Sequence, residues 1–396
     1  MKIAVIGCGT AGPAAAILLA RRGHDVSVFE RAPECRAVGA GFLLQPSGMG
    51  VLQELGILDE VVAHAAKVDC LHVTDATEKT LLKLHYRELG KDLFGAGLHR
   101  PVLLHYLIEK MKSEGIPVQW GTDITDLKQI ENQWTLSAAD GSKFSGYDFV
   151  ILANGARSKL RQWIPGRGIN RGYPWGAHWF IGENRGVFSE NELYQVVDGT
   201  RKLCGFLATG RDLDRSEPLV SLFWSIRLDE DASWRARPLD DWKTEILALC
   251  PQSKPLLDQI SHWDQIVTAA YGDVRMPRWH ADGIVVLGDA GHAMSPQLGQ
   301  GVNLALADAS CLADCIANHP LPKALQLYQC RRRFALRYYQ LATRWLTPWF
   351  QSDHEWLTPL RRLFFSMACF VPLTRRLMTR SMAGLIGHKR SRKSAK

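Results

Sequence analysis

The chain has 396 residues, 46% hydrophobic and 22% charged, a composition typical of folded globular proteins and long enough for two domains. Its formal net charge is +8, yet residues 361–396 alone hold ten Lys or Arg and no Asp or Glu. The rest of the chain carries 38 basic and 40 acidic residues, so the basic character belongs to the C-terminal end. We therefore expect no nucleic-acid groove along the protein.

The nine cysteines are scattered, without a CxxC pair or a Cys/His cluster, so no metal site is expected. Their odd number fits a reducing compartment. The apolar run after Lys2 ends at Gly7, too early for a signal peptide, and the longest late run, 363–371, is far below the roughly 20 residues of a membrane span. We expect a cytoplasmic protein.

The chain opens with a β-α-β pattern. An apolar run at 2–6 predicts a buried strand, alanines and leucines at 11–23 predict a helix, and 25–30 predicts a second strand. In chain order we then expect a short helix at 47–56, a hairpin at 71–86, a helix at 100–115, and strands at 118–120, 133–138 and 147–153.

From about residue 172 to 272 the pattern changes to strands, at 174–182, 201–210, 219–227 and 266–274, with one amphipathic helix near 240–250. A buried strand at 283–289 and a helix at 302–318 then return, and the remainder is expected to be helical with a basic end. The sequence therefore predicts an α/β fold with an inserted antiparallel sheet.

The first glycine loop, GCGTAG at 7–12, lies between the first strand and the first helix. Gly7, Gly9 and Gly12 form a GxGxxG pattern, which lets the backbone approach a pyrophosphate at the helix N-terminus. Glu30, at the end of the second strand, is placed to accept ribose hydroxyls and disfavours a 2′-phosphate. A ligand-free glycine turn is the alternative; the combination of strand, helix and acid favours a dinucleotide, either NAD or FAD.

A second glycine loop, GDAGHAMSPQLGQGVN at 288–303, also lies between a strand and a helix. Two cradles in one domain suit a long ligand with reactive chemistry at its far end, and FAD fits that description. Asp289 is expected to bind ribityl hydroxyls. The N–H groups near Gly299, Gly301, Val302 and Asn303 are expected to face the flavin ring.

This second loop resembles the GD motif of the FAD-dependent aromatic hydroxylases, the p-hydroxybenzoate and salicylate hydroxylase family of group A flavoprotein monooxygenases. YDFVILANGARSKLR at 147–161 resembles the family's DG motif, and the segment from Glu30 to 60 and HRPVLL at 99–104 are also similar to it. The resemblance spans about residues 1–320. It implies cofactor contacts for Gly7, Gly9, Thr10, Ala11, Gly12, Glu30, Arg31, Gly41, Arg100, Asn154, Gly155, Asp289, Pro296, Gly299, Gly301, Val302 and Asn303.

One position departs from the family pattern. The second motif usually reads Asp-Gly, but here it is Asn154-Gly155. Asparagine keeps the size and a hydrogen-bonding oxygen but loses the charge. FAD binding is expected to survive, whereas the choice between NADH and NADPH stays open.

The resemblance implies a single-component monooxygenase in which NAD(P)H, bound only transiently, reduces FAD. O2 then forms a flavin C4a-hydroperoxide, which hydroxylates an aromatic or otherwise electron-rich apolar substrate. Pro296 matches the position beside the flavin. The alternatives are a flavin oxidase or dehydrogenase without hydroxylation and a non-catalytic FAD-fold scaffold, to which Asn154 lends slight support.

The resemblance also divides the chain. We expect a Rossmann-like FAD-binding domain at 1–171 and 273–345, and a substrate domain at 172–272 joined by the hairpin near 70–90. C-terminal helices and a basic tail are expected at 346–396.

Aromatic residues of the inserted sheet are candidates for the substrate pocket. We single out Trp175, Trp179, Phe223 and Trp224, with His178 as a candidate base for a phenol. The alternative is that they fill the core, since strand alternation sends half of them to the other face. His292 has the same two interpretations, a proton shuttle near the flavin or a residue that satisfies loop groups, and the second is favoured.

The basic tail also leaves two interpretations open. Apolar residues with interleaved arginines, followed by HKRSRKSAK at 388–396, suit peripheral contact with an anionic membrane and a lipophilic substrate. A solvated basic end is the alternative. The sequence does not indicate the oligomeric state.

Overall fold

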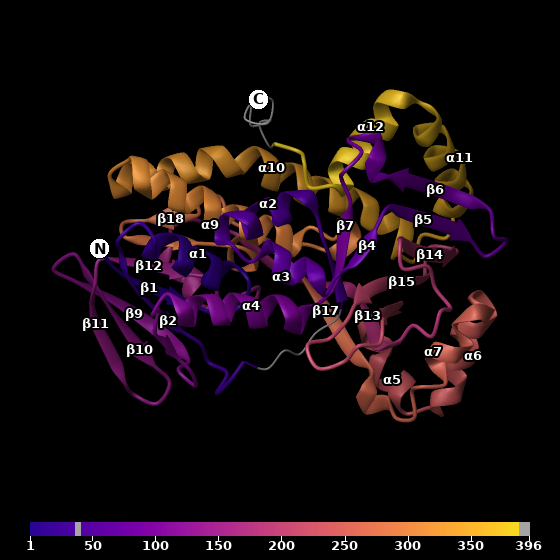
Figure 1. Cartoon of the computed structure of the whole chain (residues 1–396), viewed down its shortest axis with the longest axis horizontal. Coiled ribbons are helices and arrows are strands. Elements are labelled where there is room, and N and C mark those ends of the chain that lie inside the picture. Colours follow the sequence, from indigo (N-terminus) through magenta and orange to yellow (C-terminus); the bar gives the residue numbers. More distant parts are fainter. Residues whose placement is uncertain (36–40, 388–396) are drawn as a thin grey trace.

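The structure is a computed structural model and describes residues 1–35 and 41–387. Its first part is built on a six-stranded sheet (Figure 1). In order across the sheet, the strands are β18 (His280–Ala281), β19 (Ile284–Val286), β12 (Phe149–Leu152), β1 (Lys2–Ile6), β2 (Asp25–Phe29) and β8 (Val118–Gln119). All neighbours pair in parallel except β18 with β19. The central strands β1 and β12 are buried apolar runs, as a parallel sheet covered on both faces requires.

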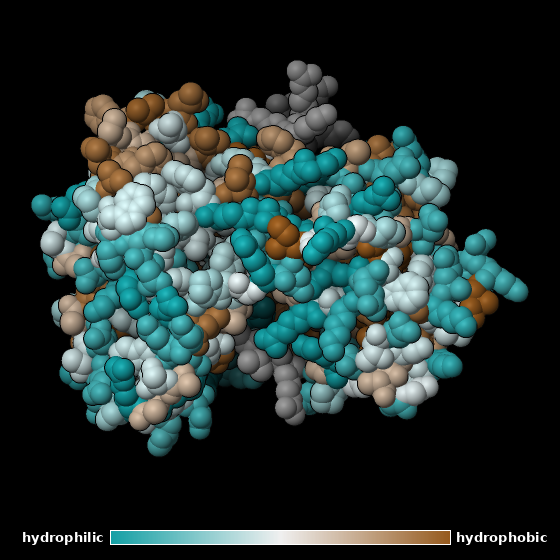
Figure 2. Space-filling view, turned by 180° about the vertical axis from the view of Figure 1, so that it is seen from behind, coloured by the Kyte–Doolittle hydropathy of each residue, from teal (hydrophilic) through white to brown (hydrophobic). Residues whose placement is uncertain are grey.

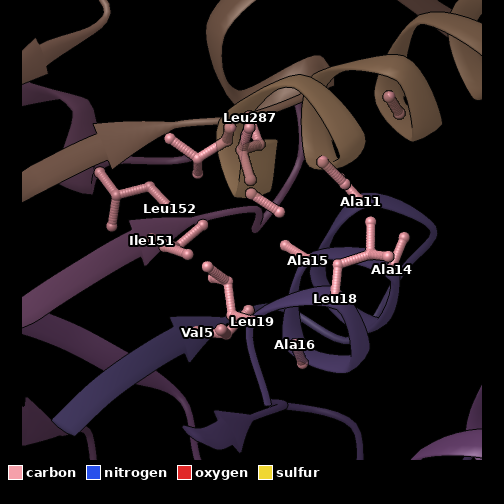
Figure 3. Packing of buried hydrophobic residues seen from close by; sticks show 14 of the residues in the cluster. Val5, Ala11, Ala14, Ala15, Ala16, Leu18, Leu19, Ile151, Leu152 and Leu287 are labelled. Carbon is pink, nitrogen blue, oxygen red and sulfur yellow. The ribbon is translucent and has the colours of Figure 1, made fainter. Parts of the chain in front are cut away.

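Helices α1 (Ala11–Ala20) and α9 (Gly301–Asn318) pack together against this sheet. Figure 3 shows the alanines of α1, among them Ala11, Ala14 and Ala15, close to Val5 and Ile151 of the sheet. Small side chains let a helix approach its neighbours closely. The N-terminus of α1 is thereby held next to the chain segment that leads into α9.

A seven-stranded sheet forms the second part, in the order β17-β13-β16-β15-β14-β5-β6. The hairpin expected near 70–90 joins this sheet, and it does so through a parallel pairing of its first strand, while the other neighbours are antiparallel. The strands are β5 (Cys70–Asp75), β6 (Thr80–His85), β13 (Ile169–Glu183), β14 (Glu192–Asp198), β15 (Lys202–Gly210), β16 (Leu219–Arg227) and β17 (Val267–Arg275).

Smaller elements connect and cover the two large sheets. A three-stranded sheet, β3-β7-β4, packs on β15, and a second, β11-β10-β9, lies at the edge of the first part (Figure 1). Their bounds are β3 (Gly41–Leu44), β4 (Ala66–Val68), β7 (Gly95–His99), β9 (Ile124–Ile130), β10 (Gln133–Ala138) and β11 (Lys143–Tyr147). The accompanying helices are α2 (Pro46–Leu55), α3 (Leu58–Ala63) and α4 (Arg100–Ser113).

Helices cover the outer face of the seven-stranded sheet. These are α5 (Asp231–Arg235), α6 (Leu239–Leu249) and α7 (Lys254–Leu257). Trp242 and Ile246 of α6 are fully buried in a separate apolar core with Phe206 and Leu222 of the sheet. The second part therefore has its own hydrophobic core.

The chain ends in three helices, α10 (Leu321–Phe350), α11 (Leu357–Phe370) and α12 (Pro372–Met382). Helix α10 packs along α9, and α11 and α12 cover β6 at the far end of the molecule (Figure 1). Within residues 1–35 and 41–387, no helix is both long and apolar enough to cross a membrane.

A glycine on β7 makes the close packing of β7 on β15 possible. A substitution at this glycine tests that role. A Cβ at Gly97 would overlap the Ala208 carbonyl oxygen. Gly97→Ala should lower the free energy of unfolding by about 1–3 kcal/mol, measured by urea denaturation. The matched control is Gly50→Ala in α2, where a Cβ meets open space and should instead stabilise by about 0.5–1 kcal/mol. Equal effects of the two substitutions would contradict this account.

Candidate functional site

The first glycine loop follows β1 and opens into α1. Gly7 has φ of 108°, and Cβ atoms at Gly7 and Gly12 would collide with the Ala153 and Gly7 carbonyl oxygens respectively, so both positions require glycine. Gly9 faces open space. No side chain accepts a hydrogen bond from the first N–H groups of α1, at Thr10 and Ala11. These N–H groups are therefore free to bind a ligand in the open space beside Gly9.

Glu30 lies at the end of β2, beside this loop. Its carboxylate accepts hydrogen bonds from the N–H groups of Cys8 at 2.7 Å and Ala32 at 2.9 Å. The acid is therefore fixed next to the glycine loop, where a ribose would lie if a dinucleotide occupied the cradle. Arg31, the next residue, is exposed.

The second glycine loop begins after β19 with the short helix α8 (Asp289–His292). Asp289 is exposed, and its carboxylate has no hydrogen-bonding or ionic partner among the residues that the structure describes. A Cβ on Gly301 would lie 3.9 Å from Asp289 Oδ1, so the carboxylate stands at the start of α9. Gly299, in the left-handed region at φ of 60°, leads into that helix start together with Val302.

The side chain of Asn303 has a structural role that the sequence did not reveal. Its Oδ1 accepts a 2.8 Å hydrogen bond from the Gln45 N–H, and its Nδ2 donates to the Leu43 carbonyl at 3.2 Å. The side chain thus fixes β3 and the start of α2 against α9, which leaves only its backbone N–H for a ligand. Gly41, at the start of β3, pairs with His99, and the exposed Arg100 follows that residue at the start of α4.

A third loop follows β12 and contains Asn154 and Gly155. Gly155 has φ of 78°, and Asn154 Oδ1 is buried without a hydrogen-bond partner in the described part of the chain. Arg161 donates to the Ala290 carbonyl at 3.1 Å and to the Ala156 carbonyl at 2.9 Å. This loop is therefore tied to the second glycine loop by one guanidinium.

The three loops converge because β1, β12 and β19 are parallel neighbours, so their C-terminal ends meet at one edge of the sheet. A Cβ at Gly7 would touch Ala153 and Asn154 of the third loop, and one at Gly288 would lie 3.4 Å from Ala11 Cβ. Together the loops form a cradle with bare glycines, free N–H groups, a free carboxylate and an unpartnered amide oxygen. These groups fit the pyrophosphate, the ribityl hydroxyls and the ring of FAD.

A buried ionic network holds the second loop in place. Asp308 of α9 accepts hydrogen bonds from the Gly288 N–H at 3.0 Å and from Arg332 Nε at 2.7 Å, and its Oδ2 lies 2.5 Å from His292 Nε2. Burial acts to raise the pKa of Asp308, but His292 and Arg332 outweigh it and lower that pKa to about 2. His292 is therefore a structural residue here, as favoured from the sequence, although it bonds a carboxylate rather than loop backbone.

The stretch around Pro296 is supported from the C-terminal side. Ser295 Oγ lies 2.8 Å from Thr347 Oγ1, and Gln297 Nε2 donates to Gln351 Oε1 at 2.7 Å. Gln351 in turn donates to the Gly176 carbonyl of β13 at 3.0 Å. This support could not be predicted from the sequence, because Thr347 and Gln351 lie some fifty residues away with no motif around them.

The aromatic candidates lie on different faces of the seven-stranded sheet. Trp179 and Phe223 are cross-strand partners with ring centroids 5.1 Å apart. Their face includes Ser221, against which Gly41 packs, so it is the face directed toward the first part of the molecule. Trp175 lies at the strand end, with the Arg201 guanidinium 5.8 Å from its ring centroid.

His178 and Trp224 point to the opposite face, and this corrects their assignment to a substrate site. They are cross-strand partners, and both are buried under the helices of the second core. His178 Nε2 bonds Asp231 at 2.7 Å, and its ring lies against Trp242 and Trp263. Burial lowers the pKa of His178, but the residue has no access to the glycine loops, so it is not a phenol base. Strand alternation, already recognised in the sequence, is the cause.

Four buried polar atoms belong to the sheet face that carries Trp179. They are Trp179 Nε1, Thr209 Oγ1, Ser221 Oγ and Tyr271 Oη. The Trp179 and Tyr271 groups lie beside each other, and Thr209 Oγ1 and Ser221 Oγ have no hydrogen-bond partner in residues 1–35 and 41–387. Native proteins pair nearly all buried polar atoms, so this cluster is a candidate for contact with a bound group. Only Trp179 of these was anticipated from the sequence.

Comparison with known proteins identifies relatives of this chain. A family model described as an FAD binding domain matches residues 1–333. The 6-hydroxynicotinate 3-monooxygenase of Pseudomonas fluorescens is 26% identical over 84% of this chain and 87% of its own. The 3-amino-4-hydroxybenzoate 2-monooxygenase of Streptomyces cremeus is 27% identical over 85% and 87%.

Solved structures share the fold. Klebsiella pneumoniae HpxO, complexed with FAD and uric acid, superposes with a TM-score of 0.83 over 97% of both chains at 21% identity. Pseudomonas aeruginosa PqsL, in complex with 2-aminobenzoylacetate, gives 0.80 over 93% of this chain and 99% of its own at 23% identity. This chain therefore has the same fold as these two proteins.

The Asp308 network predicts a pH-dependent stability. Its folded pKa of about 2 lies below the unfolded value of 3.8, so its stabilisation is present above about pH 4 and is lost as pH falls towards 2. Asp308→Asn should lower the free energy of unfolding by about 3–5 kcal/mol at pH 7, and by less at pH 3, in urea denaturation. Asp314→Asn, on the exposed side of α9, is the control and should cost at most about 1 kcal/mol. A loss that does not change with pH would contradict the assigned role.

Proposed function

The chain belongs to the family of FAD-binding-domain flavoproteins and is an FAD-dependent monooxygenase of aromatic compounds, and on that basis we propose how its residues divide the work. FAD would lie across the three loops. The pyrophosphate would meet Gly9 and the start of α1, and the ribose would meet Glu30. Gly7, Gly12 and the Asn154-Gly155 turn would shape the cradle.

The far end of FAD would lie at the second loop. There Asp289 would accept hydrogen bonds from ribityl hydroxyls, and the N–H groups from Gly299 to Asn303 would face the ring. Pro296 would border the ring, while Arg31, Gly41 and Arg100 would flank the cofactor. Bound FAD supplies the redox chemistry with NAD(P)H and O2, and the protein's own groups position it and exclude water.

We propose that the substrate binds over the sheet face of Trp179 and Phe223 and is an uncharged aromatic or other electron-rich apolar compound. The observation that carries this proposal is the cluster of buried polar groups on Trp179, Thr209, Ser221 and Tyr271, in which the two hydroxyls of Thr209 and Ser221 have no partner among the described residues. All four are neutral groups, and burial, not a neighbouring charge, dominates the raised pKa of Tyr271. A carboxylate brought here would lose its hydration and would find no cation among these four groups.

The location of the protein in the cell and the limits of its domains are further parts of the proposal. The protein is expected in the cytoplasm, with peripheral contact to a membrane suggested by the basic C-terminal end. Residues 388–396, which carry half of that charge, lie outside the described residues. The domain limits 1–171 with 273–345, 172–272 and 346–396 stay predictions.

The ribityl contact can be tested by substitution. Asp289→Ala removes an exposed carboxylate that has no role in the protein's own hydrogen bonding, so the fold should be unaffected. The dissociation constant for FAD should rise about 10- to 100-fold, measured by fluorescence titration of the apoprotein. Asp282→Ala, at the exposed turn between β18 and β19, is the matched control. If Asp289→Ala holds FAD as firmly as the parent, the assigned role is wrong.

The neutral pocket can be tested with a matched pair of ligands. 3-Hydroxybenzamide and 3-hydroxybenzoate have the same shape but differ in charge. The amide should perturb the visible flavin spectrum and stimulate NAD(P)H oxidation at concentrations at which the benzoate does neither. Preference for the benzoate would overturn the proposal.

A second measurement separates recognition from stability. Ser221→Ala removes a hydroxyl that has no partner in the free protein, so the free energy of unfolding should be unchanged or higher. The dissociation constant of the amide should rise about 5- to 10-fold. Loss of stability without loss of binding would show that Ser221 serves the fold instead.

A further inference from the structure

The three C-terminal helices expose several large apolar side chains. We define the apolar face as Phe334 and Leu341 of α10, Leu363, Met367 and Phe370 of α11, and Leu373 of α12. Their exposed fractions range from 60% to 90%, and Phe370 is the most exposed of them. Figure 2 shows apolar surface gathered over this end of the molecule, where Figure 1 places α11 and α12.

Packing within the protein does not account for this face. Helix α11 buries Leu357, Arg361 and Phe365 on one side, which attaches it to the rest of the chain. Leu363, Met367 and Phe370, spaced by four and three residues, follow a separate stripe on the solvent side. Apolar patches of this kind on a folded protein mark a surface that contacts something else.

The charged side chains of the three helices themselves all have one sign, although the exposed Asp353 and Glu355 lie in the loop between α10 and α11. Helices α10, α11 and α12 contain eleven Lys or Arg and no Asp or Glu. Arg362 and Arg375 are paired with Asp75 and Glu88 of the hairpin. In contrast, four exposed arginines have no acidic partner in the part of the chain described by the structure: Arg333, Arg337, Arg376 and Arg380.

We propose that the apolar face docks on the surface of a lipid bilayer with anionic headgroups. The exposed apolar side chains would enter the boundary between headgroups and acyl chains, and the unpaired arginines would meet lipid phosphates and acidic headgroups. Trp345 and Trp356, which are 47% and 66% exposed, have the amphipathic rings that settle at this interface. The proposal rests on the membrane contact suggested above and assigns it to the folded helices rather than to the terminal tail.

Charge distinguishes the bilayer from other occupants. A second copy of the chain would bring the same unpaired arginines against each other, which opposes self-association. A nucleic acid would meet the arginines but would gain little from Leu363 or Phe370. An anionic bilayer satisfies both the charge and the apolar area.

The test is flotation of the full-length flavoprotein with vesicles. The protein should float with vesicles of phosphatidylcholine and phosphatidylglycerol mixed in equal parts, much less with phosphatidylcholine alone, and less at high salt. Failure to float with the mixed vesicles would overturn the proposal. Because the enzyme's flavin content and turnover are measured separately, this outcome would leave the proposed catalytic function untouched.

Two double variants locate the contact. Leu363→Ser with Phe370→Ser removes apolar area, and Arg337→Glu with Arg376→Glu reverses charge. Each should reduce the partition constant to mixed vesicles by about tenfold or more, with FAD content unchanged. The matched control combines Lys128→Glu with Ile130→Ser, an exposed basic and apolar pair on β9 far from these helices, and should bind as the parent does.

Deletion of 388–396 separates the helices from the tail. If the deletion abolishes flotation while both double variants float normally, the tail makes the contact and the assignment to the helices is overturned. If Leu363→Ser with Phe370→Ser instead converts a dimer to a monomer in light scattering, with flotation unchanged, the apolar face is a protein interface and the proposal is again overturned.

Discussion

The parallel order β19-β12-β1-β2 is the constraint on which the rest of the structure depends. Because these strands point the same way, the loops that leave them open at one edge, although they lie almost 300 residues apart in the chain. The Asp308 network and the Arg161 guanidinium then lock the second loop to the others. The parallel pairing of these strands thus brings three local motifs together into a single proposed cradle for FAD.

The sequence was sufficient for this cradle and for the fold class because the relevant signals are local. A glycine such as Gly7 is required by its own backbone conformation, and the buried strands before the loops are short apolar runs. Asn303 shows the limit of such reasoning. Its place in the motif was recognised, but its side chain serves β3, and that partner lies 260 residues away in the chain.

The substrate side could not be predicted in the same way, because it depends on which face of a strand each residue occupies. Trp179 and His178 are neighbours in sequence, yet they lie on opposite faces of the sheet, and His178 is buried in a separate core. Thr209 and Tyr271 come from strands that only the folded sheet brings to the same side. The pairing register of the strands determines which residues line the proposed pocket, and a single sequence does not reveal that register.

The supports of Ser295 and Gln297 set a limit to what counts as the catalytic unit. Similarity to the FAD-binding family model ends at residue 333, but Thr347 and Gln351 lie beyond that point. A fragment cut where the family model ends would keep every recognisable motif but would lose the support that Thr347 and Gln351 give to the loop around Pro296. The part of the chain that the family model matches is therefore shorter than the part that holds this loop in place.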